Sequence, residues 1–143
     1  MRRLLLVGLL GCVGCLEPGD AFLAPRDTDP PDVLSTEPSA GGTVPATGAL
    51  QILFSEAMDA RSLRPGIAVF VGRAEVPLEI TVPPEVEGGE EEKGDVPATV
   101  TVRAEGGRWV AGTAYTLVLR TSLLDFEGNA LAREVRVPFR TEP

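Results

Sequence analysis

The chain lacks histidine altogether and has little lysine or aromatic content. Lys93 is its only lysine, and its 143 residues include one Trp and one Tyr. Without histidine, the commonest general base and the commonest metal-binding side chain are missing. Ser-His-Asp and Cys-His catalytic sets are therefore excluded. A pair of carboxylates that cleaves sugars would have too few aromatic side chains to line its cleft. We expect no enzymatic activity.

Positive charge is also scarce. The chain has 13 basic and 21 acidic residues, a net charge of −8, and without Arg2 and Arg3 it has 11 basic and 21 acidic residues, a net charge of −10. Such a surface repels phosphate groups, so we expect no nucleic acid partner. Electrostatic docking onto anionic lipid is opposed for the same reason.

The N-terminus has the order of a bacterial export signal. Arg2 and Arg3 precede an apolar run from Leu4 to Leu10. This run is too short to span a bilayer, which takes about 20 apolar residues, so it predicts a secretory signal peptide. The sequence LLGC, ending at Cys12, resembles the lipobox of bacterial lipoproteins, and CVGC, ending at Cys15, is a second match.

The choice between the two cysteines stays open at this point. The motif favours Cys12, whereas a leader of ordinary length favours Cys15, which we prefer, with residues 1–14 as the signal peptide. A C-x-x-C redox or metal pair is the alternative, but no second cysteine pair accompanies it. The lipid would hold the chain on a membrane, at the outer membrane or cell surface in preference to the inner membrane.

Two segments follow the leader, and the second contains an acidic loop. Residues 15–31 are rich in Pro and Asp and predict an extended linker. Residues 32–142 predict one folded domain. Inside it, residues 85–95 (EVEGGEEEKGD) hold six acidic residues and one lysine. This acidic loop has too little apolar content to pack, so an exposed loop is predicted. A patch that faces an envelope protein partner, or a weak cation site, is the functional alternative.

Apolar and polar residues alternate in about seven short segments of this domain, as in half-buried strands. Seven short strands separated by turns are typical of an all-β, immunoglobulin-like Greek-key sandwich. Pro138 places its segment at a sheet edge or at a bulge. The predicted segments are 33–35, 50–55, 67–71, 78–82, 100–102, 115–119 and 135–140.

Six motifs follow one another along this domain: PDVLSTEP (31–38), GGTVP (41–45), LFSEAMD (53–59), GTAYTL (112–117), DFEGNAL (125–131) and FRT (139–141). In this order they resemble bacterial Ig-like domains of the S-layer-protein (SbsA-like) type. The resemblance implies a sandwich fold, a location outside the cytoplasm, and a role as a spacer or adhesive module. The chain has one copy where the family usually has repeats, which argues against a pure spacer.

Two aromatic residues have an expected structural role. Trp109 and Tyr115 are spaced like the tyrosine corner of such sandwiches, in which the tyrosine hydroxyl bonds to upstream backbone. Trp109 would then cover the core beneath it. Stacking of Trp109 on a ligand is the alternative.

Five residues form a candidate calcium site. In this topology the loop after the second strand and the loop after the sixth lie at the same pole. Glu56 and Asp59 would then approach Asp125, Glu127 and Asn129, and calcium takes six to eight oxygen ligands of this kind.

Local roles are the alternative for two of these residues. Asp59 would cap a short helical turn at residues 60–63, and Asp125 would stabilise its own turn. The sequence thus predicts an envelope lipoprotein with a structural, adhesive or protein-interaction role. A calcium- or carbohydrate-binding module is one alternative, and an accessory subunit that pairs with a partner through a strand edge is another.

Overall fold

All seven segments that alternate in sequence contain strands in the structure. This computed structural model describes residues 26–82 and 96–143. The leader, residues 15–25 of the predicted linker and the acidic loop 85–95 lie outside the described residues. Within the described ranges the elements are β1 (Val33–Glu37), β2 (Gly42–Val44), β3 (Leu50–Phe54), α1 (Ala60–Gly66), β4 (Ile67–Val71), β5 (Ala74–Glu75), β6 (Leu78–Thr81), β7 (Ala98–Ala104), the 3-10 turn η1 (Glu105–Gly107), β8 (Ala114–Leu119) and β9 (Val135–Thr141).

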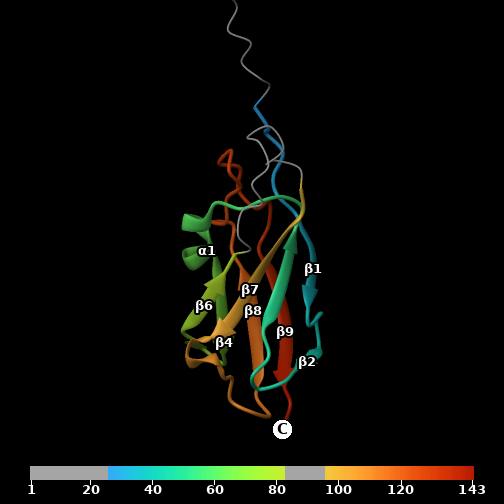
Figure 1. The fold of residues 1–143 in the computed structure, drawn as a ribbon, viewed down its shortest axis with the longest axis vertical. Helices are drawn as coiled ribbons and strands as arrows, with labels where there is room; N and C mark the ends of the chain where they lie inside the picture. Colours follow the sequence, from blue (N-terminus) through green and yellow to red (C-terminus); the bar gives the residue numbers. More distant parts are fainter. Residues whose placement is uncertain (1–25, 83–95) are drawn as a thin grey trace, which may run out of the picture.

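These strands form two sheets packed face to face (Figure 1). The four-stranded sheet has the order β1-β3-β7-β6 and is antiparallel throughout. The five-stranded sheet has the order β2-β9-β8-β4-β5, with β2 parallel to β9. The predicted all-β sandwich is confirmed.

Two strands escape prediction because they are too short to show a period. β2 spans three residues and is held by β9, and β5 spans two residues and is held by β4. Helix α1 runs beyond the predicted turn at 60–63 and ends at Gly66. A Cβ at Gly66 would collide with the Leu123 side chain, so the close packing of the helix end requires glycine there.

Pro138 lies in β9, directly before the residues of β9 that pair with β2. Its carbonyl oxygen accepts the Gly41 N–H at 2.7 Å, and β2 pairs with β9 only from Phe139 onward. The two backbone polar groups of a strand residue point to the same side. The nitrogen of Pro138 therefore faces the outer side of β9, where no ladder hydrogen bond is lost.

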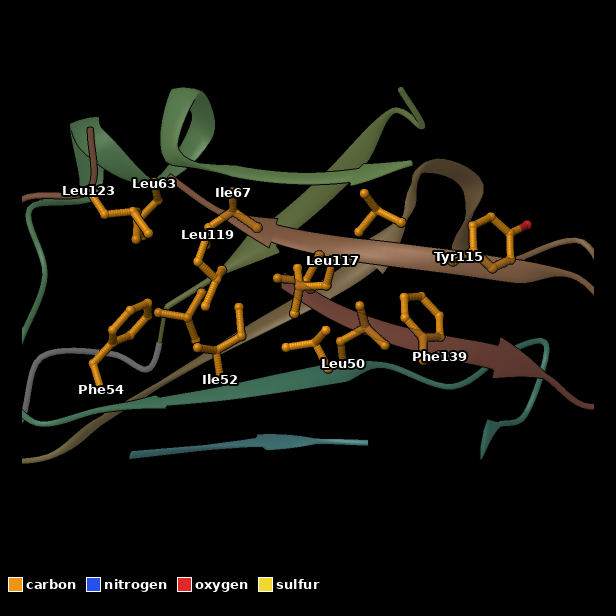
Figure 2. Packing of buried hydrophobic residues seen from close by; sticks show 14 of the residues in the cluster. Leu50, Ile52, Phe54, Leu63, Ile67, Tyr115, Leu117, Leu119, Leu123 and Phe139 are labelled. Carbon is orange, nitrogen blue, oxygen red and sulfur yellow. The ribbon is translucent and has the colours of Figure 1, made fainter. Parts of the chain in front are cut away.

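The core fills the space between the two sheets (Figure 2). In β3, Leu50, Ile52 and Phe54 point inward and are at most 1% exposed. Leu117 and Leu119 of β8 meet them from the opposite sheet. Each such side chain contributes about 2 kcal/mol of favourable transfer on burial. The core is continuous along the sandwich and fixes the loops at both ends.

The sandwich has two ends, which differ in chemistry. The acidic pole is formed by residues 26–32, 55–66 and 120–134, joined by hydrogen bonds such as Ser55 N to Asp32 O. The C-terminal pole is formed by residues 45–49, 105–113 and 142–143, joined by Gly112 N to Glu142 O. Figure 1 shows α1 at the first pole and the C-terminus at the second.

Candidate functional site

The acidic pole is built by loops that are bonded to one another. After β8 the chain turns back on itself, with isolated bridges between Leu124 and Ala130 and between Met58 and Asp125. Ser62 of α1 joins the helix to this loop, because its Oγ accepts the Leu124 N–H at 3.0 Å. The side chains of this pole are therefore positioned by paired backbone.

Four carboxylates converge at this pole. Asp27, Glu56, Asp125 and Glu127 each have a carboxylate oxygen that lies within 4.8 Å of the others, and we call them the acidic group. Glu56 is 7% exposed and Asp125 is 1% exposed, whereas Asp27 and Glu127 are half-buried. Like charges this close repel one another, and burial strengthens the repulsion. Such a group is stabilised by hydrogen bonds or by a cation.

Asp125 has a local explanation for its burial. Its Oδ1 accepts the Asn129 backbone N–H at 2.7 Å, and its Oδ2 accepts the Asn129 side-chain amide at 2.8 Å. Gly128, between them, has φ of +92°, a value that glycine adopts without strain. Asp125 thus closes the turn that carries Glu127.

Glu127 has no comparable partner at one oxygen. Its Oε2 is buried and has no hydrogen-bond partner within the described residues. A buried carboxylate oxygen without a donor costs free energy. A hard cation bound to this oxygen would remove that cost. Calcium is such a cation, and it binds carboxylate oxygens at about 2.3–2.6 Å.

Asp59 lies outside the acidic group and acts locally. Its Oδ1 accepts the Arg61 backbone N–H at 2.9 Å, which caps the N-terminus of α1. Its Oδ2 pairs with Arg61 Nη2, also at 2.9 Å. These hydrogen bonds from the Arg61 side chain and backbone hold the pKa of Asp59 below its usual value.

Asp27 was not among the candidate residues. It stands in the Pro- and Asp-rich segment predicted as linker, and no motif or spacing marks it. The structure brings it to the acidic pole because Asn129 Nδ2 donates to its carbonyl oxygen at 3.2 Å. Asn129 therefore uses its amide nitrogen as a donor to both Asp27 and Asp125.

Trp109 and Tyr115 lie at the C-terminal pole. Tyr115 Oη accepts the Val110 N–H at 3.0 Å, and Trp109 Nε1 donates to Gly48 O at 2.9 Å. The Trp109 ring meets those of Tyr115 and Phe139 edge-on, with centroids 5.4 and 5.7 Å away. This is the geometry of a tyrosine corner. Trp109 is 2% exposed, so its ring has no open face for a ligand.

A shallow groove of about 270 Å³ lies beside the edge strand β6. Five of its seven lining residues are apolar, and Arg64 and Glu75 are charged, so the groove offers both apolar and polar contacts. The lining residues are Arg64, Ile67, Glu75, Val76, Pro77, Leu78 and Ile80.

Sequence comparison agrees with this architecture. A family described as bacterial Ig-like domain matches residues 27–141. The chain belongs to this family. Bacterial Ig-like domains of this type occur in extracellular or surface proteins and are generally structural or interaction modules. No curated protein matches the chain. Among the residues that the structure describes, no helix is both long and apolar enough to cross a bilayer.

Proposed function

We propose that the chain is an envelope lipoprotein whose Ig-like domain contacts another envelope protein or serves an architectural or adhesive role. The observation that carries the proposal is the order of parts along the chain. A leader with two lipobox-like cysteines precedes one bacterial Ig-like domain at 27–141. The LFSEAMD and DFEGNAL motifs favour the S-layer type within that family.

The surface of the domain suits a contact with protein. β6 ends the four-stranded sheet in the described part of the chain, and the groove of mixed polarity runs beside it. An edge strand next to a groove that takes side chains is the kind of surface that pairs with a partner's strand. The net charge of −8 keeps nucleic acid and anionic lipid from competing for it.

Membrane attachment is tested by removing both candidate acceptors. The chain with Cys12→Ser and Cys15→Ser should move from the membrane fraction to the soluble fraction of a bacterial host, because a thioether-linked lipid needs the thiol. Each single variant identifies the acceptor. The control is Val110→Ser, a change at an exposed residue about a hundred positions after the leader in sequence, which should stay in the membrane fraction. A double variant that still pellets with membranes would contradict lipid anchoring.

Calcium binding at the acidic pole is the second candidate. It is supported by the convergence of Asp27, Glu56, Asp125 and Glu127, whose carboxylate oxygens lie within 4.8 Å of one another. Oxygen-only ligands match a hard cation. The carbohydrate-binding alternative has less support, since Trp109 is buried.

Calorimetric titration of calcium, with melting in calcium and in chelator, tests this candidate. Ligand at 100 times its Kd stabilises the folded state by about 2.7 kcal/mol, which raises the melting point by several degrees. Glu127→Gln should abolish the heat signal and the rise. Glu105→Gln, the same change at an exposed residue of the C-terminal pole, should preserve both. Absence of heat and of any melting shift in the unaltered chain would exclude a calcium site.

A further inference from the structure

The segment that leads into β1 is bonded to the domain at its C-terminal end. Here residues 26–32 are named the strap. Asp32 N–H donates to Ser55 Oγ at 2.9 Å, and Ser55 N–H donates back to Asp32 O at 2.8 Å. Pro31 is buried next to this pair. Two reciprocal hydrogen bonds and a buried ring fix the strap against the loop that follows β3.

The strap is also bonded at its N-terminal end, to a different loop. Arg26 Nη2 donates to Glu127 O at 2.7 Å, and Asn129 Nδ2 donates to Asp27 O at 3.2 Å. These partners are 101 and 102 residues away along the chain. The contacts therefore depend on the folded sandwich and are not local turn contacts.

Between these ends the strap is stiff. Asp29 N–H donates to Asp27 Oδ1 at 2.9 Å, which closes a local turn. Pro30 and Pro31 each have φ near −65° by the ring constraint, so the strap loses little backbone freedom when it docks. Its composition predicts an extended linker, but the same prolines also lower the entropy cost of holding one conformation.

From this geometry we propose that the strap is a fixed joint, which sets the direction in which the N-terminal segment leaves the domain. The joint lies at the acidic pole, so an anchored chain would present its C-terminal pole away from the membrane. The part of the chain that the domain holds would then begin at residue 26 and not at residue 32. The joint is a property of the domain, and it stands whether or not a lipid is attached.

Trypsin cleavage of the Arg26–Asp27 bond tests the joint. The Arg26 side chain must leave Glu127 O before it can enter the protease, so docking protects this bond. The full chain is digested, and the cleavage rate at each site is followed by mass spectrometry. We expect cleavage after Arg26 at least about tenfold slower than in a synthetic peptide of residues 20–32, since several hydrogen bonds must open together.

Two variants loosen the joint from opposite ends. Asn129→Ala and Ser55→Ala each remove one hydrogen bond to the strap, and each should raise cleavage after Arg26 about fivefold. Asn129→Ala also removes the bond to Asp125 Oδ2, which does not involve the strap. Cleavage after Arg136, in the middle of β9, reports global unfolding and should not change. Thr113→Ala removes a hydrogen bond to Ala111 O at the C-terminal pole and is the matched control.

Three results decide the matter. Protection in the unaltered chain that both loosening variants relieve, with Arg136 cleavage constant, supports the joint. A rate equal to that of the peptide would overturn it, because the strap would then be open in solution. Variants that change cleavage after Arg26 and Arg136 in parallel would overturn it too, because protection would come only from global folding.

Discussion

Replacing Tyr115 by Phe removes one hydroxyl and leaves the aromatic ring. In the structure Tyr115 Oη accepts the Val110 N–H at 3.0 Å, and Tyr115 is 5% exposed. The ring stacks on Phe139, with centroids 5.4 Å apart and planes at 18°, and the substitution keeps that contact. The perturbation is therefore confined to one hydrogen bond and the backbone donor that loses its acceptor.

The expected loss of folding stability is therefore that of one broken hydrogen bond. A partly buried N–H without an acceptor costs about 1–3 kcal/mol, and no cavity is added because the ring volume is unchanged. We expect Tyr115→Phe to lower the free energy of unfolding by about 1–2 kcal/mol. Urea denaturation followed by Trp109 fluorescence measures this difference. For a domain of this size the midpoint should fall by roughly 0.5–1 M, with an unchanged slope.

Val110→Ala is the matched control for this measurement. Val110 is 69% exposed and keeps its N–H in the variant, so the free energy of unfolding should change by less than about 0.5 kcal/mol. Equal stabilities of Tyr115→Phe and the unaltered chain would refute the reasoning, since the hydroxyl would then contribute nothing at the corner.

Two further predictions concern α1. Gly66→Ala places a Cβ against the Leu123 side chain and should destabilise the domain by at least about 2 kcal/mol, whereas Gly72→Ala, at φ +59° in open space, should cost only about 1 kcal/mol in thermal or urea unfolding. The lowered pKa of Asp59 contributes stability that is present above its ordinary value of 3.8 and is lost as pH falls through the folded-state pKa. Arg61→Gln should therefore flatten the loss of stability below pH 4 in melts at stepped pH, and an unchanged acid limb would contradict the role of this pair.

The sandwich is predictable from sequence because its main strands have a local signature. Ile52 and Phe54 alternate with polar or less buried neighbours, and both point into the core. β2 and β5 have no such signature. They form only because β9 and β4 supply hydrogen-bonding partners, which is a property of the folded sheet.

The acidic pole is predictable only in part, for a similar reason. Strand order brings the loop with Glu56 close to the loop with Asp125 and Glu127, and these three carboxylates converge in the structure. Asp27 joins them because the strap contacts residues about a hundred positions later in the sequence. No local pattern in the strap predicts these contacts. Asp59 is close in sequence to Glu56, but the start of α1 turns its side chain to Arg61.

We propose above all that this Ig-like domain is held at a membrane by a lipid on an N-terminal cysteine. Intact mass spectrometry of the chain purified from membranes of a bacterial host tests it most directly. The account predicts a mature chain that begins at Cys15, with a mass raised by a diacylglyceryl group and with no residue of 1–14 attached. A mature chain that begins at Cys12 and carries the same lipid would identify Cys12 as the acceptor and would still support lipid anchoring. A chain without added lipid mass, whatever its first residue, would contradict it.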